Sequence, residues 1–210
     1  MEAKGADPMR KPAIVFDLGG VLIEWKPQLI FSDHFPGDPS AVDAFLSEIR
    51  FPEWNVEQDK GRSFAEGVSI LKQEFPRHAG ILDMLSTNWE ASLVGQIEGS
   101  VEILRSLKER GFRLYGLSNW SQETFTRTRV RYPFLELFDD ILISGEVCMV
   151  KPDPGIFELC LNRIGRPARE CLFIDDSRVN IATAENLGFE VVHFVSPEQL
   201  RRELSARGIL

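Results

Sequence analysis

The sequence predicts an α/β fold, a doubly wound parallel-sheet core with an inserted all-helical subdomain, and two observations carry this prediction. Short apolar runs alternate with helical segments from residue 97 onward, and such repeated units form a parallel sheet with helices on both faces. Between residue 40 and about residue 94, by contrast, the apolar residues recur only at helical spacing. A block of this size indicates a small subdomain rather than a loop.

The first element is a buried parallel strand, predicted from the apolar run Ala13–Phe16. The run ends on Asp17, and Gly19 and Gly20 then allow a sharp turn beside the carboxylate. Ligands of open α/β sheets bind at this edge, outside the carboxyl ends of the strands. Taken alone, the window is equally compatible with an acid that only caps a turn or a helix.

The later elements are predicted from apolar spacing and from capping residues. In the helical block we expect about four helices, with joints near Pro52, Gly61 and Pro76. In the second half we expect strands at 112–117, 141–143, 171–174 and 189–195. The expected helix starts are Ser100, Ser121, Asp153 and Ser196, and the expected helix stops are Gly111, Gly165 and Gly188.

These elements divide the chain into three parts. Residues 1–11 are expected to be a disordered tail, because they are charged, contain Gly and Pro, and lack the apolar segment of a secretory signal. Residues 12–25 and 95–210 form the α/β core. Residues 26–94 form the inserted unit, called the helical block from here on.

Composition limits the partners of the protein. The net charge of −8 argues against binding to nucleic acid or to an anionic membrane, and no apolar run approaches the ~20 residues of a membrane span. Cys148, Cys160 and Cys171 lack metal-ligand spacing and indicate reduced thiols in a cytoplasmic protein. We expect a monomer or a weak homodimer.

Polar residues follow the predicted strands at four places, namely Asp17, Ser118–Asn119, Lys151 and Asp175–Asp176. Each place alone is explained by a turn, a helix cap or a solvated surface. Because the carboxyl ends of parallel strands share one edge of the sheet, however, we expect these side chains to converge. Their combination favours a functional site.

The chemistry of this set is that of phosphoryl transfer. Three converging carboxylates repel one another, a bound cation relieves the repulsion, and oxygen ligands of this kind favour Mg²⁺. Lys151, the Ser118 hydroxyl and the backbone N–H groups of the 18–20 turn offer an anion site. A carboxylate nucleophile, a divalent cation and an anion clamp are the parts that an aspartyl-phosphate mechanism needs.

Four segments resemble the motifs of the haloacid dehalogenase-like (HAD) hydrolases, in the family's order and spacing. They read Phe-Asp17-Leu-Gly-Gly-Val-Leu, Leu-Ser118-Asn, Val-Lys151-Pro-Asp-Pro and Phe-Ile-Asp175-Asp176-Ser-Arg-Val-Asn180. The resemblance covers about residues 12–202 and implies a Rossmann-like core, with the helical block as the family's C1 cap over the active site. The chain looks most like the α-glucose-1-phosphatase branch, in which an acid also falls at the position of Glu24.

The resemblance implies a role for each matched residue. Asp17 would be the nucleophile, and Lys151 would be the second catalytic residue. The ligands of Mg²⁺ would be Asp17, the Gly19 carbonyl, Asp176 and, directly or through water, Asp175. The substrate phosphate would be bound by Gly19, Gly20, Ser118, Asn119 and Lys151, and Asn180 would support the metal site from behind.

The chain departs from the family pattern at Gly19, where most phosphatases of the family carry a second Asp as general acid. Such an acid contributes about 10²–10⁴-fold in rate, so its absence leaves three alternatives. Another group supplies the proton, for which the candidates are Glu24, Glu57, Asp59 and Glu90. Otherwise the substrate has a good leaving group, such as an anomeric sugar hydroxyl or an acyl group, or the reaction does not transfer phosphate.

Three functional hypotheses follow. The leading one is a Mg²⁺-dependent phosphatase of a small phosphorylated metabolite, for which a sugar phosphate is one candidate. The first alternative is a metal-independent 2-haloacid dehalogenase, although those enzymes typically carry Ser-Ser-Asn where this chain has Asp175–Asp176–Ser177. The second is a non-catalytic relative that only binds a ligand or a partner.

Several residues near these motifs keep two interpretations. The polar stretch Trp54–Arg62, with Glu57, Asp59 and Arg62, fits either substrate contact or a solvated joint between helices. Trp120 either walls the site or packs beside it. Trp25 and Trp89 are predicted to be packing residues.

Overall fold

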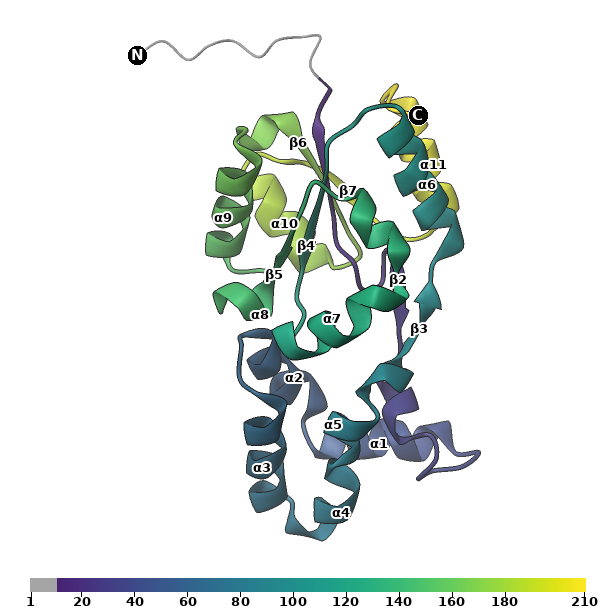
Figure 1. Ribbon diagram of the computed structural model, residues 1–210, viewed down its shortest axis with the longest axis vertical. Helices are drawn as coiled ribbons and strands as arrows, with labels where there is room; N and C mark the ends of the chain where they lie inside the picture. The colour runs from purple at the N-terminus through teal and green to yellow at the C-terminus, as the bar shows by residue number, and fades with distance from the viewer. Residues whose placement is uncertain (1–10) are drawn as a thin grey trace.

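The computed structural model describes residues 11–210, and its core is a five-stranded parallel sheet (Figure 1). The strands are β1 (Ala13–Phe16), β4 (Leu114–Ser118), β5 (Asp140–Ile143), β6 (Cys171–Asp175) and β7 (Glu190–His193). They lie in the order β5–β4–β1–β6–β7, and every pair is parallel. The predicted α/β core is confirmed. The expected disordered tail, apart from Lys11, lies outside the described residues.

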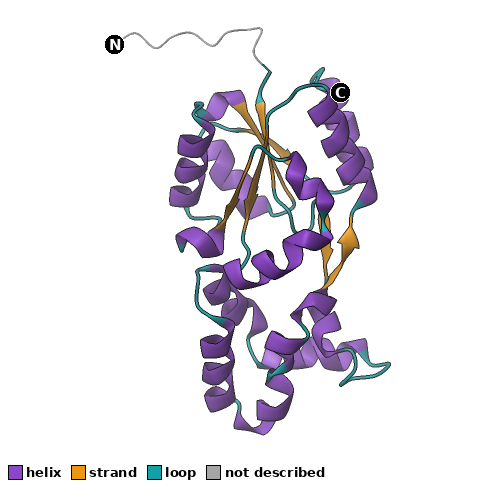
Figure 2. Ribbon diagram, viewed as in Figure 1, coloured by secondary structure: helices purple, strands orange, loops and turns teal. Residues whose placement is uncertain are grey.

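Two layers of helices enclose the sheet. α6 (Glu98–Glu109) and α11 (Pro197–Ala206) cover one face, whereas α9 (Pro154–Ile164) and α10 (Arg178–Asn186) cover the other (Figure 2). Alternate residues of β1 enter the two apolar cores, Ile14 and Phe16 on one side and Ala13 and Val15 on the other. Because both faces of β1 are buried, its sequence is continuously apolar rather than alternating.

The helical block sits beyond the carboxyl ends of the strands (Figure 1). Its α-helices are α1 (Pro39–Glu48), α2 (Phe51–Asp59), α3 (Phe64–Glu74), α4 (Ala79–Leu82) and α5 (Met84–Thr87), with 3-10 segments at 27–31, 76–78 and 89–92. It has its own core, in which Trp54, Phe64 and Trp89 meet edge to face. Two short core helices, α7 (Gln122–Thr128) and α8 (Ser144–Val147), lie on the side of the sheet that faces this block.

A two-stranded antiparallel ribbon joins the two units. β2 (Ile23–Trp25) leads the chain into the helical block and β3 (Leu93–Gln96) leads it back. The sequence did not predict this ribbon, because three or four residues with mixed burial show no clear alternation. The ribbon brings Trp25 beside Trp89, with ring centroids 6.3 Å apart.

One local prediction is wrong. Ser100 does not cap a helix, because α6 already begins at Glu98, and the Ser100 hydroxyl is buried inside the helix without a partner. The joint expected near Pro52 is confirmed: the break between α1 and α2 falls at Arg50, whose φ is 52°. Pro52 itself lies in the first turn of α2, where proline is tolerated. The predicted caps at Asp153 and Ser196 are confirmed by their side-chain hydrogen bonds.

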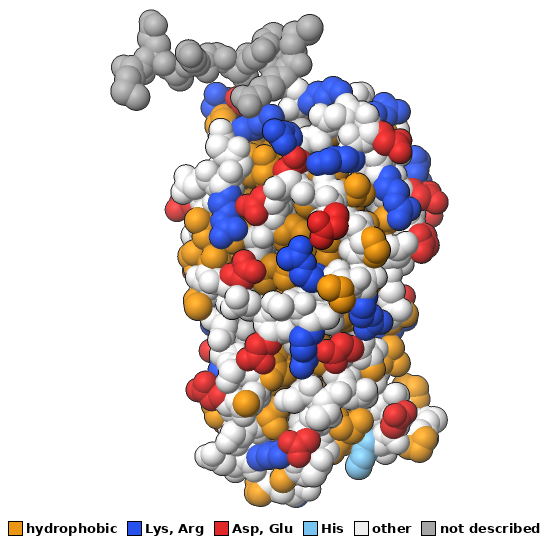
Figure 3. Space-filling model, viewed as in Figure 1, with side chains coloured by type: hydrophobic (Ala, Val, Ile, Leu, Met, Phe, Trp, Pro, Cys, Tyr) orange, Lys and Arg blue, Asp and Glu red, His pale blue; other side chains and the backbone are white. Residues whose placement is uncertain are grey.

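The surface carries both signs of charge. On the face that Figure 3 shows, Lys and Arg side chains are interspersed with Asp and Glu side chains. Within residues 11–210, each helix is too short or too polar to cross a lipid bilayer.

Candidate active site

The polar residues predicted to converge lie together at the carboxyl edge of the sheet. Asp17 directly follows β1, whereas Ser118 and Asp175 are the last residues of its two neighbours, β4 and β6. Carboxylate oxygens of Asp17, Asp175 and Asp176 all lie within 4.8 Å of one another. Parallel pairing of adjacent strands therefore produces a three-carboxylate cluster from residues far apart in the sequence.

Lys151 joins two of these carboxylates. Its Nζ lies 2.9 Å from Asp17 Oδ2 and 2.7 Å from Asp175 Oδ2, and its side chain is almost fully buried. Asn119 holds the Lys151 backbone in place, because its Nδ2 donates to the Lys151 carbonyl at 2.9 Å and its Oδ1 accepts from the Lys151 amide at 2.8 Å. The Asn119 side chain is thus used to position Lys151, although it also lines the cavity described below.

The adjacent acids Asp175 and Asp176 have different surroundings. Asp175 is fully buried and accepts hydrogen bonds from Lys151, from the Ser177 amide at 2.7 Å and from Asn180 at 3.1 Å. Asp176 instead lines the cavity. Asp175 therefore supports the cluster from within the core, whereas the Asp176 carboxylate faces the cavity.

The turn after β1 allows this close approach. A Cβ atom at Gly20 would lie 2.1 Å from Asp176 Oδ2, and the φ of Gly20 is +73°, so that a side chain here would both strain the backbone and displace Asp176. A Cβ atom at Gly19 would meet nothing within 4 Å. The Leu18 amide donates to Asp17 Oδ1 at 2.7 Å and fixes the carboxylate.

Electrostatics favour a cation in this cluster. Burial raises the pKa of Asp17 to about 7; Lys151 opposes this shift, and the neighbouring Asp175 and Asp176 add to it. Burial lowers the pKa of Lys151, but the attraction of Asp17 and Asp175 outweighs this effect and raises it. Three carboxylates thus share one ammonium group, and an all-oxygen donor set with excess negative charge fits Mg²⁺.

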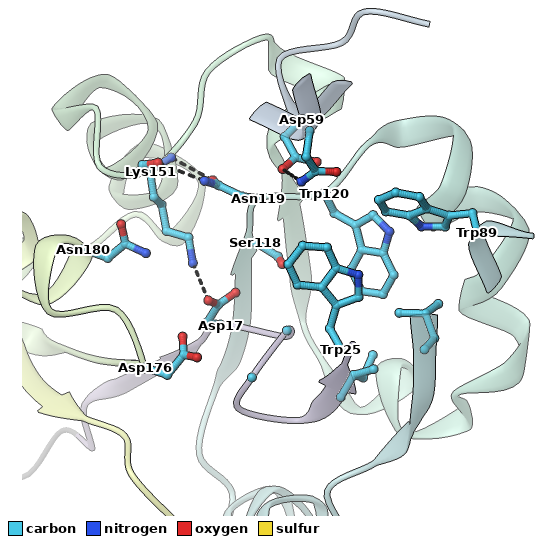
Figure 4. A pocket seen from close by; sticks show the side chains of 15 residues that line it. Asp17, Trp25, Asp59, Trp89, Ser118, Asn119, Trp120, Lys151, Asp176 and Asn180 are labelled. Carbon is cyan, nitrogen blue, oxygen red and sulfur yellow. Dashed lines mark hydrogen bonds and ion pairs between the residues drawn. The ribbon is translucent and has the colours of Figure 1, made fainter. Parts of the chain in front are cut away.

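A cavity of about 300 Å³ opens over the cluster. Asp17, Ser118, Lys151 and Asp176 form its polar side, and Figure 4 shows a group of indole rings opposite them. The apolar side is lined by Ile23, Trp25, Trp89, Leu93 and Trp120. The helical block also contributes two polar residues, Asn55 and Asp59.

Among the acids predicted as proton donors, Asp59 alone belongs to the lining described for this cavity. The others form exposed ion pairs, Glu24 with Lys26, Glu57 with Lys60 and Glu90 with Arg127. Arg62 turns inward to Gln58 Oε1, at 2.7 Å, and to the Trp54 carbonyl, at 3.2 Å. The geometry thus leaves Arg62 as a residue that supports the end of α2.

Four lining residues were not predicted as part of the site, namely Ile23, Trp25, Trp89 and Leu93. Trp25 and Trp89, predicted to be packing residues, pack against each other and also line the cavity. Asn55, from the stretch in which the sequence left substrate contact open, lines it as well. Trp120 does both of the things that the sequence left open: it packs against Phe125 and it walls the cavity. Trp25 is the sole aromatic residue between positions 17 and 30, so the local composition did not indicate this role.

Comparisons with known proteins agree with this arrangement. Residues 11–188 match the haloacid dehalogenase-like hydrolase family. Over 200 residues the chain is 34% identical to drimenol cyclase drtB of Aspergillus calidoustus; the match covers 92% of this chain but only 36% of that protein. It is 27% identical over 188 residues to sesquiterpene phosphatase astK of Aspergillus oryzae, covering 86% of this chain and 88% of astK.

A solved structure is also similar. A HAD family enzyme of Bacteroides thetaiotaomicron, in complex with magnesium and inorganic phosphate, superposes with a TM-score of 0.69 at 25% sequence identity. The match covers 89% of this chain and 96% of that chain.

Proposed function

Since the chain belongs to the haloacid dehalogenase-like hydrolase family, we propose that it is a Mg²⁺-dependent phosphatase that forms a phosphoryl intermediate on Asp17. One observation carries the proposal: the Asp17 carboxylate is held by Lys151 within a three-carboxylate cluster that opens into a cavity. Nucleophile, cation site and anion clamp are the parts that phosphoryl transfer requires.

The residues present fit a magnesium ion. Asp17, Asp176 and the Gly19 carbonyl would hold it, with Asp175 supporting the site from below. When bound, Mg²⁺ would offset the charge of the carboxylates and of the phosphate and favour the ionised form of Asp17. The solved relative that contains magnesium and inorganic phosphate supports this assignment.

Lys151 and Ser118 would bind the phosphate oxygens. Lys151 brings a positive charge into a buried site, where electrostatic interactions are strong. Ser118 is nearly fully buried and lines the cavity beside Asp17, so its hydroxyl would donate to a phosphate oxygen. Asn119 keeps the Lys151 backbone in place.

The substrate we propose is a phosphate monoester of a largely apolar alcohol. Trp25, Trp89 and Trp120 would contact the organic group, because indole rings bury large apolar areas. The relative astK is named a sesquiterpene phosphatase, and a sesquiterpene group is apolar, like the organic group of the proposed substrate. The sugar phosphate suggested by the sequence is the competing substrate, since indole faces also contact sugars.

A metal-independent dehalogenase is the less favoured function. Asp175 and Asp176 add negative charge beside Asp17, and in a reaction without a metal ion a single ammonium group would have to offset the resulting repulsion. Halide release from 2-chloropropionate without added metal would favour this alternative.

The proposed function is tested by phosphate release. We expect the purified chain to release inorganic phosphate from n-octyl phosphate faster than from glucose 1-phosphate, and EDTA to abolish both activities. Asp17→Asn is expected to lower the rate by at least about 10³-fold, because it removes the nucleophile. Activity that survives both EDTA and Asp17→Asn would contradict the proposal, and activity on glucose 1-phosphate alone would replace the substrate class.

A further inference from the structure

Gly19 carries no carboxyl group at the position where a general acid is expected, and Asp59 brings a carboxyl group to the same cavity. It is the last residue of α2, and Figure 4 shows it on the side of the cavity away from Asp17 and Asp176. Its side chain is buried, and Asn55, one helical turn earlier, donates from Nδ2 to Asp59 Oδ2 at 2.9 Å. The helical block thus presents one held carboxyl group to the cavity.

The protonation state of Asp59 suits proton transfer. Burial raises its pKa to about 7, against the lowering effects of the Ser121 backbone amide and of Lys151. The other charged side chains near Asp59 bind other groups or are exposed. Lys60 pairs with Glu57, and Arg62 donates to Gln58. Glu123 accepts from the Phe64 amide, and Glu146 lies on the surface of α8. At neutral pH both the acid and the carboxylate are therefore populated.

A second observation points to a ligand at the same place. Asn55 Oδ1 is buried and has no hydrogen-bond partner within the described residues, whereas buried polar atoms normally have one. Asn55 also lines the cavity. The hydroxyl group of an alcohol released beside Asp59 would supply the hydrogen-bond donor that Asn55 Oδ1 lacks.

We propose that Asp59 donates the proton to the leaving-group oxygen, an assignment that rests on the proposed phosphatase function. In the first step a carboxylate oxygen of Asp17 attacks phosphorus, the bond from phosphorus to the ester oxygen breaks, and that oxygen takes the proton of Asp59. In the second step water attacks the phosphorus on Asp17, and the Asp59 carboxylate takes a proton from the water. The bond from phosphorus to Asp17 breaks, and inorganic phosphate leaves.

The test compares two leaving groups. p-Nitrophenolate departs without a proton, whereas an alkoxide needs one. Hydrolysis of the phosphoryl intermediate is common to both substrates, so the comparison uses kcat/KM, which reports only the steps up to release of the alcohol. We expect Asp59→Asn to lower kcat/KM by about 10²–10⁴-fold for n-octyl phosphate and by a much smaller factor for p-nitrophenyl phosphate. In wild type, kcat/KM for n-octyl phosphate should fall as the pH rises above about 7, and this decline should be absent in Asp59→Asn.

Two further variants sharpen the result. Glu57→Gln, on the same helix but paired with Lys60 at the surface, should leave both rates unchanged. Gly19→Asp has open space for its side chain beside Asp17 and should restore n-octyl phosphate hydrolysis to Asp59→Asn. Equal losses of kcat/KM on both substrates, or no loss on either, would overturn the role of Asp59 as proton donor. Rates that do not depend on Asp17 would overturn the proposed function as well.

Discussion

At the scale of single residues, the site depends on buried charges, because one ammonium group contacts only two of three neighbouring carboxylates. Lys151 contacts Asp17 and Asp175 but leaves Asp176 facing the cavity. These residues were predictable from the sequence, because each follows an apolar run and parallel strands share one edge. Asp59 could be named only as one acid among four, since nothing local distinguishes it from Glu57, two residues before it.

Asp59 should also make stability depend on pH. Its pKa rises from 3.8 in the unfolded chain to about 7 in the folded protein, so the folded state retains a proton that the unfolded state has lost. Stability therefore falls as the pH increases from about 4 to about 7, by about 4 kcal/mol at most. Asp59→Asn removes this loss of stability. In urea unfolding the variant should therefore be more stable than wild type at pH 8, and the difference in free energy of unfolding should shrink toward pH 4. A constant difference across this range would contradict the shifted pKa.

At the scale of elements, the turn after β1 links backbone conformation to the three-carboxylate cluster. The strands and most capped helices were predictable because their apolar spacing and caps are local signals, as at Asp153 and Ser196. The ribbon β2–β3 was not, because its strands are short and pair across 67 or more residues, as Trp25 does with Leu93. Ser100 misled the prediction because a good capping residue was already inside α6.

Gly20 and Gly37 form a matched pair for testing the turn. Both have positive φ, +73° and +75°, but only a Cβ atom at Gly20 would collide with Asp176. Each alanine substitution should cost roughly 1–2 kcal/mol of stability through backbone strain, as measured by urea unfolding. Gly20→Ala alone should also raise the Mg²⁺ concentration needed for phosphate release, because Asp176 must move. Equal activity of the two variants would show that this contact has no functional consequence.

At the scale of the whole molecule, the cavity forms where the core and the helical block meet. The core supplies the charged side, and the ribbon and the block supply Trp25, Trp89 and Asp59. Which residues of this half reach the cavity was not predictable, because it depends on how two units with separate apolar cores lie against each other. In the proposed mechanism the core thus supplies the nucleophile Asp17, whereas the helical block supplies the proton donor Asp59.

Asp17 is proposed to carry the phosphoryl group, and an acid quench during turnover would trap that group on the protein. The full chain is mixed with p-nitrophenyl phosphate and Mg²⁺, quenched within the first turnovers, and digested for mass spectrometry. We predict one phosphoryl group on the peptide that contains Asp17, absent after EDTA treatment and absent from Asp17→Asn. Sustained Mg²⁺-dependent turnover with no phosphoryl group on that peptide, or with the group on another residue, would exclude Asp17 as the nucleophile.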